Sequence, residues 1–400
     1  MSTAVSIVRT LLGLLFDHTI GNIVRMVPII RLPKLERGPV SRGFLALLLG
    51  ILFFGLTMLF SASYSSAYAT SGKLYSIIKP QVMIAIVGLF FMWVLSNINY
   101  RALRLMSESL YIITVVLLIL TLLSPEDTNG TYRWVYLPGG ASFQPSELVK
   151  ICFVFAGAST MERIVTKRNL FLFIAYSGVI CGCLALMNDF GTALIFFAAF
   201  LVIAYLRSGN FATIALICTG TGFGGIMALR FLKPHVLSRF ASWRHVWQVP
   251  LEGGYQQTRA MMCIASGGLL GLGGGNGWLK YVAASDTDLV FATVSEEWGL
   301  LIALMMVLAV VCLGAFVVRS AAVGRSSFYT IGACAAISIL MVQTILNVMG
   351  TVDLLPLTGV TFPFVSNGGS SMISAWGLLA FIKAADTRQN ASFAIRLPSR

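Results

Sequence analysis

Charged residues are scarce in this sequence. Asp, Glu, Lys and Arg make up 11% of the 400 residues, and 57% of the residues are hydrophobic. Soluble globular domains carry about 25% charged and about 45–50% apolar residues, so the composition excludes that class. It predicts an all-α polytopic membrane protein, whose net charge of +13 reflects retention of Lys and Arg on the cytoplasmic side. No basic patch is interleaved with aromatic residues, so nucleic acid is not expected as a partner.

Metal-ligating residues are few, and none has the spacing of a site. The seven cysteines lie mostly in apolar runs, and only Cys263 falls in a long polar loop. His18, His235 and His245 have neither a carboxylate nor a cysteine at ligand spacing. We therefore expect no disulfide framework and no metal site built from these residues.

Long apolar runs fill most of the chain. A membrane-spanning helix needs about 20 largely apolar residues. The run at 288–318 is longer than this, so we expect its helix to be tilted or to begin outside the hydrocarbon. The predicted spans are 44–66, 79–98, 109–124, 144–160, 170–188, 190–206, 211–232, 288–318, 327–350 and 368–385.

Basic residues mark the cytoplasmic side, because Lys and Arg resist translocation. With the N-terminus inside, eighteen of the 28 basic residues face the cytoplasm, and ten spans return the C-terminus to the same side. The expected organisation is a basic cytoplasmic segment (1–43), a membrane domain (44–385) and a cytoplasmic tail (386–400). The segments that fall outside are 125–143, the large loop 233–287, and 351–367.

An ionisable side chain inside a span is costly and is a functional candidate by default. Glu147 and Lys150 are three residues apart and share one face of a helix. They form either a structural ion pair or, together with Arg133 from the preceding loop, the polar wall of a cavity for an anionic substrate. The sequence leaves both interpretations open.

Three further acids lie beside apolar segments. Asp189 directly precedes a predicted span, where it serves either as a helix N-cap or as a functional group. Glu296 and Glu297 are adjacent, so they point to different sides of one helix and at most one faces a given cavity. Either can instead accept an interhelical hydrogen bond.

Two segments are rich in turn-forming residues. The glycine run at 267–277 lacks the Lys-Ser/Thr and the βαβ context of a nucleotide loop. We expect it to be a flexible re-entrant or surface segment over the mouth of a cavity. The segment 362–371 marks a broken or late-starting helix, whose free N–H groups could bind an anion.

Several motifs, in this order along the chain, resemble the SEDS family of bacterial membrane proteins, to which FtsW, RodA and SpoVE belong. They extend over residues 56–371. The motifs are Leu56-Thr-Met-Leu-Phe-Ser-Ala-Ser63, Gly130-Thr-Tyr-Arg-Trp134, Phe143-Gln-Pro-Ser-Glu-Leu-Val-Lys150, Asp189-Phe-Gly-Thr192, Gly253-Gly-Tyr-Gln256, Ser266-Gly-Gly-Leu269, Thr287-Asp-Leu-Val-Phe-Ala292, Glu296-Glu297 and Pro356-Leu-Thr-Gly-Val-Thr-Phe-Pro-Phe-Val-Ser366, continuing into Gly368-Gly-Ser-Ser371.

The resemblance implies about ten transmembrane helices with a large extracytoplasmic loop before the eighth, in the bacterial cytoplasmic membrane. It implies polymerisation of lipid II into peptidoglycan glycan strands, in complex with a class B penicillin-binding protein. That glycosyl transfer requires a base near the attacking hydroxyl, and positive charge or a divalent cation, the only cofactor suggested, near the departing pyrophosphate. The expected substrate-binding residues are Arg133, Glu147, Lys150, Tyr255, Gln256 and Ser370.

The outer loop departs from the family pattern. In the family, an aspartate thought to be the catalytic base precedes a proline shortly before Gly-Tyr-Gln, and here Val249 occupies that place. A second departure replaces the family's glutamate and histidine with Ala284 and Asp286. A valine cannot accept a proton, so the usual base is missing.

Three explanations of this departure stay open. Glu252 can replace the base, or Asp286 or Asp288 can do so, and we take Glu252 and Asp288 as the catalytic candidates. Alternatively, the chain no longer polymerises and acts as a lipid-binding protein or a regulator of a penicillin-binding protein. A transporter of the lipid-linked precursor is a further alternative that needs no base.

Overall fold

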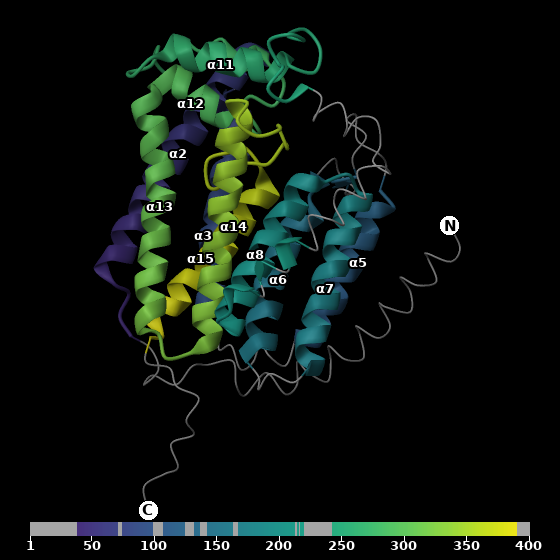
Figure 1. Ribbon diagram of the computed structural model, residues 1–400. Coiled ribbons are helices and arrows are strands. Elements are labelled where there is room, and N and C mark those ends of the chain that lie inside the picture. The colour runs from purple at the N-terminus through teal and green to yellow at the C-terminus, as the bar shows by residue number, and fades with distance from the viewer. Residues whose placement is uncertain are drawn as a thin grey trace, which may run out of the picture.

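The computed structural model (Figure 1) describes most of the membrane domain. The predictions made for His18, His235, most of the span 211–232 and most of both terminal segments lie outside the described residues. The described residues are 38–70, 74–98, 107–124, 132–136, 142–162, 167–212, 214–215, 217–219 and 242–389.

Helices form over the predicted apolar runs, because a helix satisfies its own backbone hydrogen bonds in a medium without water. In the first half of the chain these are α2 (Arg42–Thr70), α3 (Leu74–Asn97), α5 (Ser107–Leu122), α6 (Pro145–Glu162), α7 (Lys167–Leu186) and α8 (Phe190–Ser208). Near the C-terminus they are α14 (Ser327–Thr351) and α15 (Gly369–Thr387). As expected, the segment before α15 is not helical, and that helix starts late.

The run at 288–318 does not form one helix, which corrects the sequence prediction. It is divided into α12 (Val290–Trp298) and α13 (Leu300–Val323) at Gly299, whose φ of 87° lies in the left-handed region. A Cβ at this position would lie 2.2 Å from the carbonyl oxygen of Leu269. Only glycine accepts both the dihedral angle and this close approach.

Four helices in the described part of the chain are individually long and apolar enough to cross a membrane. They are Lys79–Asn97, Phe190–Ser208, Leu300–Val323 and Ser327–Thr351. Shorter apolar helices accompany them at Arg42–Thr57, Ser109–Leu122 and Leu172–Leu186. The chain is therefore a polytopic helical membrane protein.

The bundle is organised around α14, the most buried of these spans. It packs against α6, α8, α13 and α15, and α15 in turn packs against α3 and α6. Aromatic rings fill the space between α6, α7 and α8, where Phe153 contacts Phe173, Tyr176 and Phe196. One continuous apolar core links both halves of the chain.

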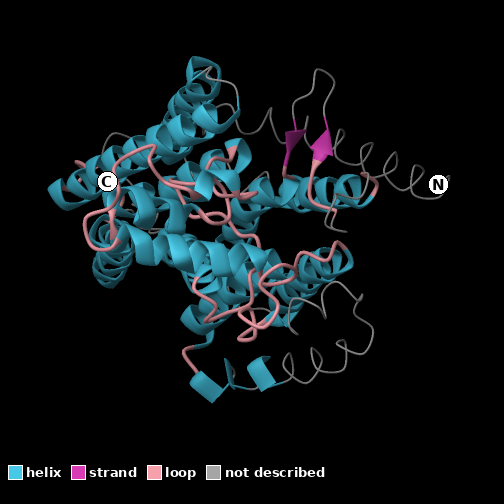
Figure 2. Cartoon of the chain, turned by 90° about the horizontal axis from the view of Figure 1, so that it is seen from above, coloured by secondary structure: helices cyan, strands magenta, loops and turns pink. Residues whose placement is uncertain are grey.

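One end of the bundle carries the non-helical segments and a short helix, α11 (Tyr255–Gly267), which lies across it (Figure 1). Figure 2 shows the one small hairpin of the described residues, β1 (Val135–Tyr136) and β2 (Ser142–Phe143), with Val135 opposite Phe143. The 3-10 helix η3 (Leu279–Tyr281) completes this end.

The three segments predicted to lie outside meet at this end. Arg133 donates to the carbonyl of Gly359, the indole of Trp243 donates to the carbonyl of Leu354, and the amide of Asn367 donates to Asp286. Each contact joins residues that are at least 80 positions apart along the chain. The grouping inferred from basic residues therefore corresponds to real tertiary proximity.

Candidate functional site

Arg133 is the centre of a polar cluster at this end. The N–H of Tyr132 donates to the carbonyl of Met187 at 3.2 Å, and this hydrogen bond fixes the backbone next to Arg133. The guanidinium donates to the carbonyl oxygens of Thr358 and Gly359 at 3.3 and 3.4 Å, and lies 3.4 Å from Asp189 Oδ1. We call Arg133, Asp189, Asp288 and Gly359 the Arg133 cluster.

Asp189 caps a helix and also pairs with Arg133. It is the N-cap of α8, and its Oδ1 accepts a hydrogen bond from the N–H of Thr192 at 3.4 Å. The same oxygen pairs with Arg133, so the acid connects the first turn of a membrane helix to the loop cation. The N-cap interpretation is confirmed, and the contact with Arg133 is an addition that spacing alone did not reveal.

Asp288 approaches the cluster from the other side, across Gly359. A Cβ on Gly359, whose φ is +68°, would lie 3.0 Å from Arg133 Nη1 and 3.1 Å from Asp288 Oδ2. Glycine therefore allows the arginine and the second carboxylate to approach the same stretch of backbone. The amide of Asn347 holds this geometry by donating to the carbonyls of Asp288 and Val360 at 2.9 and 2.8 Å.

Asn347 was missed at the sequence level. It is a buried amide in the predicted span 327–350, and a polar residue inside an apolar run was the signal that could have identified it.

Glu147 and Lys150 form a buried ion pair, with 2.8 Å between Nζ and Oε1. Their side chains are only 5% and 1% exposed, and Glu147 Oε2 has no hydrogen-bond partner. Ser374 of α15 donates to the carbonyl of Glu147 at 2.9 Å, and Ser370 accepts from the N–H of Gln144 at 3.4 Å. Of the two open interpretations, the ion pair is present, and the hydrogen bonds of Ser374 and Ser370 join the start of α6 to α15.

Val249 and Glu252 belong to one tight turn. The carbonyl of Val249 accepts hydrogen bonds from the N–H groups of Glu252 and Gly254 at 3.2 and 3.1 Å. Val249 is half-buried, whereas Glu252 is exposed. The ion pairs of the described residues do not include one between Glu252 and Arg133.

Tyr255 and Gln256 have structural partners beside the turn. The Arg259 guanidinium lies 5.4 Å from the ring centroid of Tyr255. The Gln256 amide donates to the carbonyl of Ala283 at 3.1 Å and so ties α11 to the second altered segment. Asp286 in that segment accepts hydrogen bonds from the side chain and the backbone N–H of Asn367, both at 2.8 Å.

Glu296 and Glu297 are both buried hydrogen-bond acceptors. Glu296 accepts from the N–H groups of Trp278 and Leu279 at 2.8 and 3.0 Å, while Glu297 accepts from the hydroxyl of Ser61 on α2. A Cβ on Gly277 would contact both side chains, at 2.7 and 3.0 Å. Glu297 is therefore the acceptor of an interhelical hydrogen bond, which confirms one of the open interpretations, whereas Glu296 accepts from the backbone of the loop.

The glycine run is a mostly exposed surface segment that packs against the α12–α13 junction. It is bonded along the α12–α13 junction, with the N–H groups of Leu272 and Gly273 donating to the carbonyls of Glu296 and Glu297 at 2.9 Å. A Cβ on Gly271 would lie 2.4 Å from the Glu297 carbonyl oxygen. Nearby, burial and then the adjacent Glu296 raise the pKa of the Cys263 thiol to about 12.

A cavity of about 250 Å³ lies elsewhere in the bundle, between α3, α5, α6, α14 and α15. Its lining is almost entirely apolar and includes Phe91, Ile113, Phe155 and Phe381. It includes none of the predicted site residues, so the candidate chemistry is at the polar end rather than in this space.

Comparison with known proteins identifies the family. The model of the FtsW/RodA/SpoVE family of cell cycle proteins matches residues 42–391. A probable peptidoglycan glycosyltransferase FtsW from Coxiella burnetii is 30% identical over 340 residues, covering 81% of this chain and 90% of the relative. Stage V sporulation protein E from Bacillus subtilis is 29% identical over 347 residues, covering 82% and 93%.

Solved structures share the fold. A chain from a structure described as a peptidoglycan synthase complex that coordinates polymerization and crosslinking aligns with a TM-score of 0.70 at 22% identity, covering 88% of this chain and 98% of its own. The crystal structure of the rod shape determining protein RodA from Thermus thermophilus aligns with a TM-score of 0.61 at 23% identity, with the same coverage. With these matches and the motifs at the polar end, the chain belongs to the FtsW/RodA/SpoVE family of membrane proteins.

Proposed function

We propose that this chain binds lipid II at its polar end and polymerises it into peptidoglycan glycan strands. The relatives named as peptidoglycan glycosyltransferases support the activity. The observation that carries the proposal is the Arg133 cluster, in which an arginine and two acids from three distant segments converge. The buried Glu147–Lys150 pair at the start of α6 adds a second cation. Guanidinium and ammonium groups are the side chains suited to a pyrophosphate.

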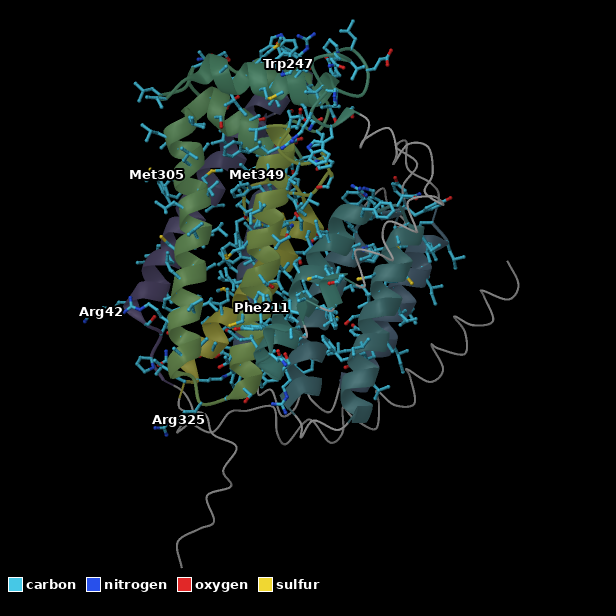
Figure 3. The ribbon with its side chains drawn as sticks, in the orientation of Figure 1. Arg42, Phe211, Trp247, Met305, Arg325 and Met349 are labelled. Carbon is cyan, nitrogen blue, oxygen red and sulfur yellow. The ribbon has the colours of Figure 1, made fainter. Side chains whose placement is uncertain are left out.

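The proposed topology has ten spans, with both termini in the cytoplasm and the polar end outside. Figure 3 supports it, because Arg42 and Arg325 lie toward the end of the bundle opposite Trp247. Lys and Arg are retained on the cytoplasmic side of bacterial membranes. In this proposed topology the Arg133 cluster lies at the outer leaflet, and we propose that the lipid-linked disaccharide is polymerised there.

In the proposed reaction, a sugar hydroxyl of one substrate attacks the anomeric carbon of another. A carboxylate takes the hydroxyl proton as the new C–O bond forms, and the bond to undecaprenyl pyrophosphate breaks. We assign the base to Glu252, because its exposed carboxylate belongs to the same turn as Val249. Asp288, beside Arg133, is the second candidate.

Arg133 and Lys150 are assigned to the pyrophosphate, with Glu147 holding Lys150 in place. Tyr255, Gln256 and Ser370 are assigned to substrate contacts at the rim. A class B penicillin-binding protein is the proposed partner, because a solved structure with this fold comes from a complex that couples polymerization to crosslinking.

The described residues contain no protein cage that would hold a divalent cation without the substrate. No three His, Cys, Asp or Glu side chains of that part of the chain converge as metal ligands. We therefore derive no step through a cation, and its contribution is measured by running the assay with and without Mg²⁺.

The test is polymerisation of labelled lipid II by the purified full chain, with and without the penicillin-binding protein. Loss of a general base typically reduces the rate by about 100- to 10,000-fold, so we expect that loss from Glu252→Gln. Asp288→Asn is the matched comparison, and the larger loss identifies the base. Absence of polymer under every condition would contradict the proposed activity.

Val249 favours a second candidate function, a non-catalytic relative that binds lipid II or regulates its partner. Val249→Asp separates the two. An increase in polymer formation would show that an aspartate at position 249 can still act as the catalytic base. Retained lipid II binding without polymer in either form would support the non-catalytic function.

A further inference from the structure

The segment after α11 exposes large apolar side chains at the edge of the molecule. Leu269, Leu270 and Leu272 are exposed, Leu270 to 84%, and Trp278 and Tyr281 follow them at 48% and 59%. We call these five residues the loop shoulder. Large side chains grouped in this way on a loop mark an interaction surface rather than scattered surface residues.

Backbone hydrogen bonds fix the height of the shoulder relative to the helices. The N–H groups of Leu300 and Leu301, in the first turn of α13, donate to the carbonyls of Gly268 and Leu269 at 2.9 and 3.4 Å. The N–H of Leu272 is bonded to the last turn of α12. The leucines are therefore held level with the first turn of a membrane-spanning helix.

The exposed face of α13 continues directly from the shoulder. Leu301, Leu304, Met305 and Leu308 are all exposed, and Figure 3 shows Met305 on the outer side of α13. This helix is long and apolar enough to cross the membrane. The apolar side chains on this face are suited to lipid, and the shoulder lies at the end of that surface.

Two basic side chains lie next to the aromatic residues of the loop shoulder. The Arg259 guanidinium lies 5.8 Å from the Trp278 ring centroid, and Lys280 Nζ lies 5.5 Å from that of Tyr281. The 3-10 helix η3, which contains Lys280 and Tyr281, contacts α2. Trp and Tyr are enriched at head-group level in membrane proteins, and basic side chains there are attracted to lipid phosphates.

We propose that the loop shoulder is an interfacial membrane anchor whose ligand is glycerophospholipid of the adjacent leaflet. The leucines insert beside the acyl chains to a depth of about 5–10 Å, as amphipathic surface segments do. Trp278 and Tyr281 sit among the head groups, with Arg259 and Lys280 near the phosphates. The anchor holds α11 at a constant height above the bundle, and it does not depend on the proposed polymerase activity.

The opposite side of the same loop provides a control. Leu251 is 78% exposed, close to the exposure of Leu270, but it lies in the turn before α11, whereas Leu270 follows that helix. Trp247, four residues before Leu251, points away from the bundle in Figure 3. Leu251 and Leu270 therefore match in residue type and exposure and differ in position.

The experiment attaches bimane to single introduced cysteines in nanodiscs that contain brominated phosphatidylcholine, a quencher. Cys218→Ser and Cys312→Ser remove the exposed native thiols, and Cys263 is buried with a raised pKa, so it labels poorly at neutral pH. The parent protein without an added cysteine provides the blank. Leu270→Cys and Leu272→Cys are compared with Met305→Cys, the lipid reference, and Leu251→Cys.

We expect quenching at 270 and 272 to approach that at 305 and to exceed that at 251 several-fold. Equal, weak quenching at 270, 272 and 251 in the protein alone would overturn the proposal. If bimane at 270 then became shielded from aqueous iodide only after a penicillin-binding protein was added, the shoulder would be a protein-docking surface instead. Polymerase activity is not part of the readout, so this result is separable from the proposed function.

Discussion

The buried charges at the start of α6 and the exposed charge of the outer loop differ in burial and in their partners. Glu147 and Lys150 have each other as partners in a space that excludes water, whereas Glu252 lies exposed in a turn defined by backbone hydrogen bonds. Removing one member of a buried pair leaves an uncompensated charge, but changing an exposed turn residue leaves the backbone intact. Departure from the family pattern at Val249 is therefore compatible with the unchanged fold.

The strongest test of this contrast is Lys150→Ala. It leaves the Glu147 carboxylate buried without a cation, so we expect a loss of about 3–5 kcal/mol in stability. Thermal unfolding of the purified protein in detergent measures it. The double variant Glu147→Gln/Lys150→Met is the control and should recover most of the loss, and a single variant as stable as the native chain would break the contrast.

The polar end also contains positions that do not tolerate change, and Gly299→Ala at the α12–α13 junction tests one of them. The new Cβ would meet the Leu269 carbonyl at 2.2 Å, and the residue would keep a φ of 87°. Strain of this kind costs about 1–3 kcal/mol. Gly182→Ala in α7, where a Cβ has no neighbour within 4 Å, is the matched control and should be neutral or slightly stabilising. Similar unfolding temperatures for both variants would contradict the prediction.

Arg133→Lys tests whether the polar cluster depends on geometry or on charge. Lysine keeps the charge but loses the planar fork that reaches the Thr358 and Gly359 carbonyls. We expect a stability loss of about 0.5–1.5 kcal/mol and weaker lipid II binding in a filter or fluorescence assay. Arg244→Lys, an exposed arginine of the same end, should change neither quantity. Equal behaviour of both variants would show that only charge matters.

The smallest expected effect is that of Glu252→Gln on stability. An exposed side chain without a structural role changes stability by less than about 0.5 kcal/mol, even though the same variant is expected to abolish polymerisation. Unfolding and activity are measured on one preparation. A large loss of stability would show that Glu252 stabilises the fold. It would contradict the view that this turn tolerates substitution.

The helices were predictable because the backbone must satisfy its own hydrogen bonds in lipid. Each apolar run with described residues contains a helix. The Asp189 cap was also within reach of local reasoning. The break at Gly299 was not, because its cause is the approach of Leu269, thirty residues earlier. Similarly, the sequence allowed Glu296 or Glu297 to accept an interhelical hydrogen bond, but only packing decided that Glu297 accepts from Ser61 and Glu296 from the backbone of residues 278–279.

The amino-acid sequence alone determined that this is a helical membrane protein and where its apolar segments lie, and its family resemblance implies that Val249 replaces an acid. These properties depend on composition, local periodicity and motif, which are fully contained in the order of residues. Only the tertiary structure decided that Arg133 pairs with Asp189 across from Asp288. Such contacts join residues far apart in the chain, and the packing of the whole bundle determines which of them form.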